Sequence, residues 1–256
     1  MSSVKLTIDG AVGVVSMAKP PNNLIDDVFI GDIVEAYRRA VETNCRAILL
    51  RSEMRHFSAG ADVLAFEEGS ATIQHSEPAL NKFLDVMENT PVPTVAAVHG
   101  AALGGGLELA LTCDMVIAAD TAFLGQLESA AGVVPLLGGT QRLVQRAGVV
   151  RAKEIAMVGR RFRPEMFERW GIINQVVPEA ELAQAAMSLA RQLAAGPTLV
   201  LQGIKRQANA AAREGIAAAD KIQVEINRDT WGAKDRKRGI EAFLTTGPGT
   251  GIFEGD

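Results

Sequence analysis

The chain has 256 residues, of which 48% are hydrophobic and 22% charged, and its formal net charge is −4. These values are typical of a globular protein with one large domain, or a domain with an appendage. The negative charge argues against a nucleic-acid partner, and no apolar run approaches the roughly 20 residues that span a bilayer. The N-terminus carries no signal-peptide pattern, so we expect a cytoplasmic protein that binds no membrane.

The first half of the chain predicts strands that alternate with helices. Apolar residues alternate on both sides of Asp9-Gly10, as in a β-hairpin, and Asp26 or Asp27 can cap the helix that follows. Alternation of strands with helices predicts an α/β fold with a mostly parallel sheet and right-handed crossovers. The later elements are expected at residues 47–50 (strand), 76–87 (helix), 94–98 (strand), 115–118 (strand) and 122–125 (extended).

Beyond about Gly138 the pattern becomes helical. We expect a core over residues 1–196 and an all-helical region over 197–256, which ends in a loose tail at Thr245 to Gly251. The Ala-rich helices of that region can cover their own core or contact a second copy of the chain. The expected helices are 140–147, 151–157, 179–194 and 198–227.

The cysteines and histidines predict no metal site. Cys45 and Cys113 follow or precede apolar strand-like runs, which favours buried, reduced thiols. The histidines at positions 56, 75 and 99 lack metal-ligand spacing.

The segment from Ala97 to Ala110 is the most informative part of the sequence. An apolar run leads into Gly104-Gly105-Gly106, and Glu108 follows two residues later. Glycines let the backbone approach a ligand closely, and the first N–H groups of a helix have no partners within the helix. The segment therefore predicts a turn that binds an oxygen with growing negative charge, with a carboxylate one turn away.

A dinucleotide-binding turn is the rival interpretation of these glycines. A strand precedes them, and Asp120 follows the next strand. However, the spacing from Gly100 to Gly106 is not the G-x-G-x-x-G pattern, and the intervening helix is short.

Two further segments place polar groups after strands. Residues 55–62 form a glycine-bearing turn that ends in Asp62, which can cap a helix over 63–67 or contribute to a site. Glu128 follows the extended piece at 122–125 and would by itself suit a solvated surface. Because ligands of open α/β sheets bind beyond the ends of strands, the three segments together favour one site. Two backbone donors and two glutamates suit an acyl carbonyl that becomes negative while a proton moves at the adjacent carbon.

These motifs resemble the crotonase superfamily, also called the enoyl-CoA hydratase/isomerase family, over nearly the full length. The resemblance implies a spiral of ββα units followed by a helical trimerisation region. It is carried by residues 56–62, 99–110, 113–114 and 138–143.

The resemblance also implies roles for individual residues. The amides of Ala61 and Gly105 would hold the thioester oxygen, Glu108 would deprotonate the attacking water, and Glu128 would protonate C2 of a trans-2-enoyl-CoA. Coenzyme A is then part of the substrate, and no separate cofactor is expected. The substrate would be lined by Ser58, Ala59, Asp62, Val63, Gly104, Pro135 and Leu136.

Three departures from the family pattern bear on the substrate. Leu136-Leu137 stands where family hydratases commonly have a glycine and a small residue, which narrows the acyl pocket. Leu64 replaces a lysine that often meets the CoA phosphates, and the basic C-terminal tail is missing. The phosphate contacts would then come from Lys19, or from Lys234, Lys237 or Arg238 of a neighbouring subunit.

The paired glutamates favour a hydratase of fatty-acid or related acyl-CoA degradation, since isomerases of the family often keep only one. The alternatives are an isomerase, or a hydratase of an unusual acyl-CoA, on the same scaffold. A third alternative is a non-catalytic acyl-CoA binder, which need not keep both carboxylates. The resemblance implies a homotrimer or homohexamer.

Overall fold

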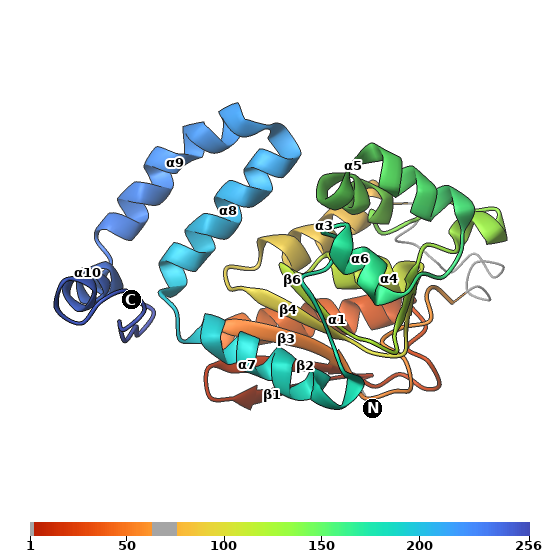
Figure 1. Ribbon diagram of the computed structural model, residues 1–256, viewed down its shortest axis with the longest axis horizontal. Coiled ribbons are helices and arrows are strands. Elements are labelled where there is room, and N and C mark those ends of the chain that lie inside the picture. Colours follow the sequence, from red (N-terminus) through yellow and green to blue (C-terminus); the bar gives the residue numbers. More distant parts are fainter. Residues whose placement is uncertain (1–2, 63–75) are drawn as a thin grey trace.

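The computed structural model describes residues 3–62 and 76–256, which build an α/β core and a helical extension (Figure 1). The main sheet has the strand order β1-β2-β3-β4-β6-β8, and all neighbours are parallel except β1 and β2. The strands are β1 (Val4–Asp9), β2 (Val12–Met17), β3 (Ala47–Ser52), β4 (Thr94–Val98), β6 (Met115–Ala119) and β8 (Gln175–Val177).

Helices cover both faces of this sheet, and β2 and β4 are buried along their whole length. α7 (Leu182–Ala194) covers one face with small side chains such as Ala186 and Ala190. α1 (Asp27–Glu42) and α3 (Glu77–Asn89) pack on the opposite face. The side chain of Asp26 accepts a hydrogen bond from the Phe29 amide at 2.8 Å, which identifies Asp26 as the cap of α1.

A second, smaller sheet is formed by β5 (Ala101–Leu103) and β7 (Phe123–Gly125), which run parallel. Single bridges join Ser58 to Ala102 and Leu124 to Phe162. The chain therefore forms a strand of the main sheet and next a short extended segment of the second sheet, and repeats this order. The repetition produces a spiral. The expected α/β spiral is confirmed, although β5 was not predicted, because a strand of three residues is too short to carry a periodic signal.

Helices α4 (Gly105–Leu111), α5 (Gly139–Val158) and α6 (Pro164–Arg169) complete the core, with short 3-10 turns η1 (Glu128–Ala131) and η2 (Glu179–Glu181). α5 contains both helical segments expected between 140 and 157, with a break at Gly148.

The helical extension contains α8 (Thr198–Glu214), α9 (Ile216–Trp231) and α10 (Lys234–Thr245). The expected continuous helix over 198–227 is wrong. Gly215 has φ 90° and ψ 168°, a backbone conformation that glycine adopts easily and other residues rarely adopt. The chain reverses its direction there and forms the α8–α9 hairpin seen in Figure 1.

The chain is anchored at Glu254 and Gly255, beyond the expected loose tail at Thr245 to Gly251, which is itself mostly exposed. Within it, the Thr250 hydroxyl donates to the Gly247 carbonyl at 2.7 Å. The Asp235 carboxylate then accepts from the amides of Glu254 and Gly255 at 2.8 and 2.7 Å. The partner of Glu254 and Gly255 lies about 20 residues earlier, which is why local composition did not reveal this anchor.

Both cysteines are reduced and buried, as expected. The Cys113 sulfur lies 3.5 Å from the Tyr37 hydroxyl, deep in the core.

Candidate active site

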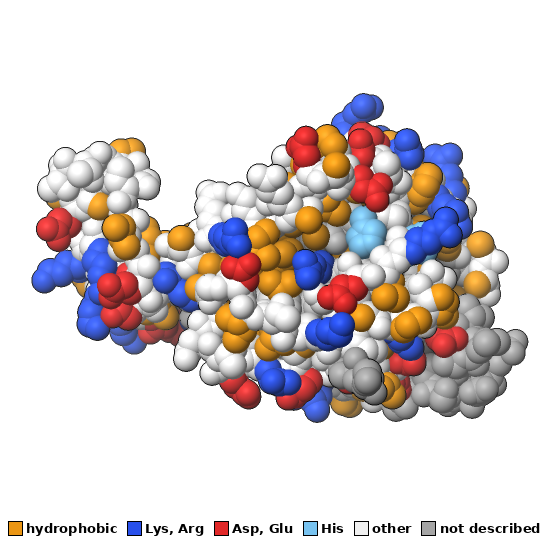
Figure 2. All heavy atoms as spheres, turned by 90° about the horizontal axis from the view of Figure 1, so that it is seen from below, with side chains coloured by type: hydrophobic (Ala, Val, Ile, Leu, Met, Phe, Trp, Pro, Cys, Tyr) orange, Lys and Arg blue, Asp and Glu red, His pale blue; other side chains and the backbone are white. Residues whose placement is uncertain are grey.

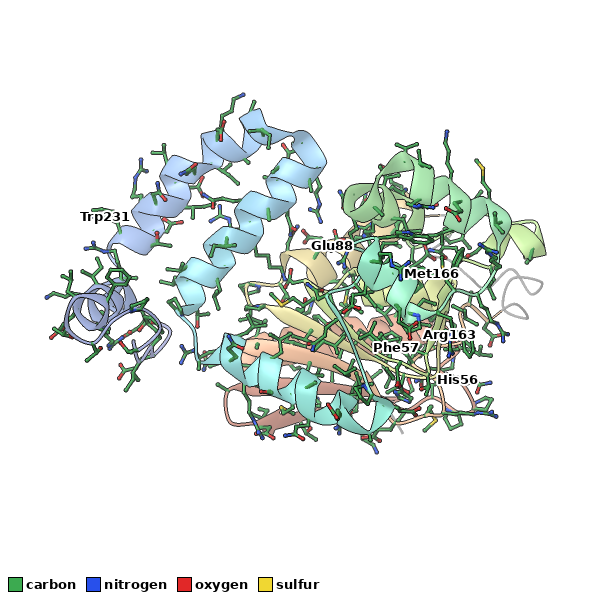
Figure 3. The ribbon with its side chains drawn as sticks, viewed as in Figure 1. His56, Phe57, Glu88, Arg163, Met166 and Trp231 are labelled. Atoms are coloured by element: carbon green, nitrogen blue, oxygen red, sulfur yellow. The ribbon has the colours of Figure 1, made fainter. Side chains whose placement is uncertain are left out.

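Neighbouring positions of the second sheet bring three distant segments of the sequence together. The Ser58 amide donates to the Ala101 carbonyl at 3.0 Å, and the Leu103 amide donates back to the Ser58 carbonyl at 3.2 Å. The Gly104 amide in turn donates to the Gly125 carbonyl at 2.8 Å. The turns that follow these positions, 59–61, 104–106 and 126–128, therefore lie in adjacent layers. Figure 3 shows the side chains around these turns, with His56 and Phe57 labelled just ahead of the first.

Two backbone amides, those of Ala61 and Gly105, lie close together where the first two turns meet. Ile25 bridges Ala61 by bonding to both of its neighbours, so the Ala61 N–H points away from Ile25. Gly105 begins α4, and its N–H is one of the amides that a helix leaves unpaired. A methyl group on Gly105 would lie 3.7 Å from the Ala61 nitrogen. Within residues 3–62 and 76–256, neither amide donates to a protein acceptor.

Gly104 permits the close approach of the third segment. It has φ 52°, and a methyl group there would lie 2.8 Å from Oε1 of Glu128. A side chain at this position would displace the Glu128 carboxylate. The glycine run therefore places one carboxylate beside the paired amides.

Glu108, on α4, brings the second carboxylate. Its side chain is 1% exposed. Oε1 accepts hydrogen bonds from the amides of Leu137 and Gly139 at 2.9 and 2.7 Å, and Oε2 accepts from the Leu136 amide at 3.3 Å. These three donors come from the loop that leads into α5, so the carboxylate sits at the N-terminus of that helix. Oε2, with a single long hydrogen bond, keeps unused capacity to accept a further hydrogen bond.

The surroundings raise the pKa of both carboxyls. Burial and then the charge of Glu128 raise the pKa of Glu108 to about 7, against the three loop amides, which lower it. Burial also raises the pKa of Glu128. The two groups interact, so they titrate as a pair that holds a proton closer to neutral pH than isolated glutamates do.

Gln126 is a site residue that sequence reasoning missed. It is fully buried, and with its amide nitrogen turned to Glu128 it donates to the two carboxylate oxygens at 3.0 and 2.8 Å. A methyl group on Gly139 would lie 2.7 Å from Cγ of Glu108 and 2.0 Å from the Gln126 amide, so this glycine lets the two side chains meet. The only available signal was its position directly after the extended piece that ends at Gly125.

Other predicted site residues support the first turn. Ser58 is completely buried, and its hydroxyl donates to the Asn23 carbonyl at 2.8 Å while accepting from the Gly60 amide at 3.2 Å. Its side chain is thus placed to hold the turn rather than to meet a ligand. The Ala59 amide donates to the Asn22 carbonyl at 3.0 Å, in the same supporting role.

The remaining predicted residues are distributed around the site. The Asp62 amide donates to the Ile25 carbonyl at 2.9 Å, and Pro135 and Leu136 are half-buried in the loop before α5. Val63, Leu64 and the helix expected over 63–67 lie outside the described residues.

Three of the four cations considered for the CoA phosphates form ion pairs within the chain. Lys19 lies 2.5 Å from Asp26, and Lys234 lies 2.7 Å from Asp256. Arg238 contacts three carboxylates, those of Asp235, Glu254 and Asp256.

Across the described part of the chain, no group of His, Cys, Asp or Glu side chains is arranged to hold a metal ion. The site therefore combines two backbone donors with two carboxylates of raised pKa. Such an arrangement can stabilise an oxyanion while it moves protons at neighbouring atoms.

Comparison with known proteins agrees with this arrangement. Residues 7–250 match the family model described as enoyl-CoA hydratase/isomerase. A probable mitochondrial enoyl-CoA hydratase of Dictyostelium discoideum is 31% identical over 92% of this chain and 85% of its own length. A carnitinyl-CoA dehydratase of Escherichia coli is 35% identical over 79% of this chain and 78% of its own length. Among solved structures, enoyl-CoA hydratase subunit I of Geobacillus kaustophilus superposes with a TM-score of 0.92 at 32% identity, covering 99% of this chain and 98% of that one.

The fold is that of the crotonase superfamily. The chain belongs to the enoyl-CoA hydratase/isomerase family. The resemblance predicted from the motifs is confirmed, and with it the expectation of an enzyme of the hydratase class.

Proposed function

We propose that the protein adds water across the 2,3 double bond of trans-2-enoyl-CoA thioesters. The observation that carries this proposal is that Glu108 and Glu128 border the same turn as the Ala61 and Gly105 amides. A protein that only bound acyl-CoA would need the amides but not two carboxylates with raised pKa values. An enoyl-CoA isomerase needs only one of them for proton transfer.

In the proposed mechanism, the thioester oxygen accepts hydrogen bonds from the Ala61 and Gly105 amides. Glu108 takes a proton from water, whose oxygen bonds to C3 as the double bond opens. The electron pair of that bond passes to the thioester as an enolate, and Glu128 then gives its proton to C2. The net change is the addition of H and OH, and the proton left on Glu108 returns to Glu128 through solvent. Amides fixed by the fold need no reorganisation as the enolate forms, which is why such donors contribute strongly.

The number of protons that the two carboxyls bind near neutral pH suits this cycle. Hydration starts with one proton on the two carboxyls, and their raised pKa values keep such a state populated near neutral pH. The loop amides around Glu108 favour its anionic form, which is the form that acts as a base.

Apolar side chains close to the oxyanion site support a preference for short acyl chains. A methyl group at Gly105 would lie 3.3 Å from Cδ1 of Ile25 and 3.7 Å from Cδ1 of Leu137. Leu136 adds bulk in the same loop. We expect hydration rates to fall as the acyl chain lengthens from four carbons.

The direct test is to mix the purified protein with crotonyl-CoA and follow the loss of the conjugated thioester absorbance. Hydration with 3-hydroxybutyryl-CoA as product supports the proposal. Conversion of a 3-enoyl-CoA without hydration of any 2-enoyl-CoA would instead show an isomerase. Binding of CoA esters without turnover would show a binder.

We propose that the charged end of coenzyme A binds in a cavity of about 560 Å³ next to the first turn. Ala59 and Leu103 line it on the side of the oxyanion turns, and Arg55 and Arg161 supply positive charge. Among the described residues neither arginine forms an ion pair. Figure 2 shows His side chains on the surface with Lys and Arg, and also Asp and Glu, side chains around them, and Glu179 is among the lining residues of the cavity.

Two substrates test this assignment. Arg55→Ala and Arg161→Ala should each raise KM for crotonyl-CoA several-fold, because each removes a charge-assisted contact. The same variants should leave KM for crotonyl-pantetheine, which lacks the nucleotide, unchanged. An equal change for both substrates would place the CoA nucleotide elsewhere.

We propose that α9 and α10 mediate a homotrimer or homohexamer. Their exposed apolar side chains include Trp231, Phe243 and Leu244, which are 68%, 59% and 77% exposed in the single chain. Large exposed apolar surfaces mark association sites. Light scattering after gel filtration should give three or six copies, and Leu244→Asp should shift the mass toward the monomer.

The cytoplasmic location stays a prediction, because the Dictyostelium discoideum relative is named as mitochondrial. None of the described helices is long and apolar enough to cross a membrane.

A further inference from the structure

One peptide unit links the catalytic loop to a buried arginine. The Gly139 N–H donates to Oε1 of Glu108 at 2.7 Å. The Gly138 carbonyl, in the same rigid peptide plane, accepts from Nη1 of Arg142 at 3.0 Å. The backbone amide of Arg142 donates to the same carbonyl at 3.2 Å, so backbone and side chain of this residue hold it together. Because the plane moves as one body, the arginine at one end helps to fix the direction of the N–H at the other.

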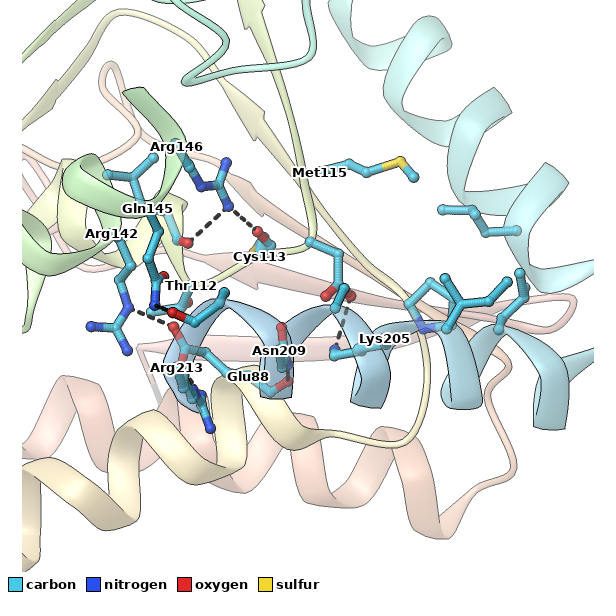
Figure 4. Close-up of a pocket in the computed structure, with 18 residues that line it drawn as sticks. Glu88, Thr112, Cys113, Met115, Arg142, Gln145, Arg146, Lys205, Asn209 and Arg213 are labelled. Carbon is cyan, nitrogen blue, oxygen red and sulfur yellow. Dashed lines mark hydrogen bonds and ion pairs between the residues drawn. The ribbon is translucent and has the colours of Figure 1, made fainter. Parts of the chain in front are cut away.

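Arg142 is itself held from two further elements. Its Nε donates to Oε1 of Glu88 on α3 at 2.5 Å, and both side chains are about nine-tenths buried. The second carboxylate oxygen of Glu88 forms an ion pair with the guanidinium of Arg213 on α8. Figure 4 shows Glu88 lying between Arg142 and Arg213. The helical extension is thus joined to the loop around Glu108 through two ion pairs and one peptide unit.

We propose that Arg142 is a positioning residue that, anchored by Glu88, sets the Gly138–Gly139 peptide so that Glu108 is held in its catalytic orientation. This inference rests on the proposed hydratase function for its kinetic test. The arginine does not touch the substrate, and it acts through the amide that Glu108 accepts. A positively charged donor on the carbonyl also polarises the peptide and strengthens the N–H as a donor.

The charges around the network decide the sign of its effect. Glu128 faces Glu108 directly, while Arg142 has Glu88 and Arg213 around it and Arg146 one helical turn away on α5. The amide of Gly139 lowers the pKa of Glu108. Loss of Arg142 therefore weakens a group that stabilises the anion, and the pKa of Glu108 rises further.

The chain offers a matched control in the cavity of about 390 Å³ that Glu88, Arg142 and Arg213 line. Lys205 on α8 lies 2.8 Å from Asp114 and is 8% exposed, and like Arg213 it ties the extension to the core. Within residues 3–62 and 76–256, its other hydrogen bond goes to the Val92 carbonyl, so it has no contact with the loop around Glu108.

The test compares Arg142→Met with Lys205→Met over a range of pH. For Arg142→Met we expect kcat for crotonyl-CoA to fall about 10- to 100-fold, as for other residues that orient a reacting group, with KM changed less than about twofold. The acid limb of its kcat profile should move to higher pH. Lys205→Met should lose stability to urea while it keeps the wild-type kcat and acid limb.

A second measurement does not depend on turnover. Isotope-edited infrared spectra of the wild type, calibrated by subtraction of Glu108→Gln, report the protonation of this carboxyl directly. We expect its midpoint to move to higher pH in Arg142→Met and to stay in place in Lys205→Met. This readout applies even if the wild type does not hydrate crotonyl-CoA, so failure of the proposed function and failure of this inference are distinguishable.

Equal pH profiles and equal infrared midpoints in the two variants would overturn the proposal. If Arg142→Met does not fold, Glu88→Gln serves in its place, because it removes the charge that anchors Arg142. It should lower kcat several-fold and move the acid limb in the same direction, and an unchanged limb would overturn the proposal as well.

Discussion

The spiral core and the helical extension are stabilised in different ways. In the core, side chains from strands and helices interlock, and residues such as Phe29, Ile48 and Leu107 have no exposed surface. In the extension, α8 is attached to the core by polar contacts such as the ion pair of Lys205 with Asp114. Large apolar side chains there remain exposed, and Leu244 for example is 77% exposed. The core therefore has an interior closed within the single chain, whereas the extension carries large apolar side chains at its surface.

This contrast separates the chemistry from the assembly. The core holds every residue of the proposed mechanism, including both carboxylates and both amides. The extension reaches the site only indirectly, through Arg213 and Glu88. Changes in the core should therefore alter the reaction, and most changes in the extension should alter stability or association instead.

The largest expected effect comes from the two carboxylates. Glu108→Gln and Glu128→Gln should each lower kcat by about 10²–10⁴-fold, as is typical when general acid–base catalysis is removed. The fold should persist, because a glutamine oxygen at position 108 still accepts from the Leu137 and Gly139 amides. Circular dichroism and light scattering check that the assembly is intact, and near-wild-type kcat in either variant removes that residue from the mechanism.

The two roles can be told apart with a saturated substrate. Exchange of the C2 protons of butyryl-CoA in D₂O needs the group that serves C2, so it should be lost in Glu128→Gln and kept in Glu108→Gln. The opposite result would exchange the two assignments.

The next effect concerns the paired amides. Gly105→Val would bring branches into the space between Ile25 and the Ala61 amide, and we expect kcat to fall about 10²–10³-fold, as when an oxyanion donor is lost. Gly31→Val on α1 is the control, since open space surrounds that position. Equal activity of the two variants would show that the oxyanion is held elsewhere.

The raised pKa of Glu108 predicts a pH dependence. Its value of about 7 means that the base is protonated below neutral pH, so kcat/KM should fall as the pH drops below about 7. The same shift makes the folded state bind this proton more tightly than the unfolded chain, whose ordinary value is 4.5. The contribution of Glu108 to the free energy of unfolding therefore decreases as pH rises from about 4.5 to 7, by about 3 kcal/mol.

Urea unfolding at pH 5 and pH 8 checks this sign. Glu108→Gln has no charge at this buried position. Its free energy of unfolding, relative to that of the wild type, should therefore be higher at pH 8 than at pH 5. A difference that stays constant would mean that the carboxyl is not destabilised in its charged form.

The smallest effect is expected where the extension meets the core. Arg46 donates to the Gly196 carbonyl, the Thr198 hydroxyl and the Phe253 carbonyl, which join α8 and the C-terminal segment to the start of β3. Arg46→Gln should lower the free energy of unfolding by about 2 kcal/mol with kcat unchanged, since hydrogen bonds from charged groups contribute at this level. Arg38→Gln, exposed on α1, is the control, and a loss of kcat in Arg46→Gln would show that the extension acts on the chemistry more strongly than the structure suggests.

Much of the fold could be predicted from local patterns. The strands at 47–50, 94–98 and 115–118 lie within β3, β4 and β6, because continuous apolar runs signal strands buried on both faces. The helix break at Gly215 was missed, because a single glycine in an Ala-rich run tells little about direction until the partner helix is known.

What the sequence by itself determined was the set of chemical groups and the order in which they occur: glycine turns after strands, with a carboxylate near each of two of them. Only the tertiary structure decided their meeting, because single pairings of the second sheet, such as Ser58 with Ala102, align turns that are about forty residues apart. It also decided the state of Glu108, since burial, the nearby charge and three amides from a distant loop set its affinity for a proton. Such couplings depend on distances across the fold, and a local pattern of residues contains no information about them.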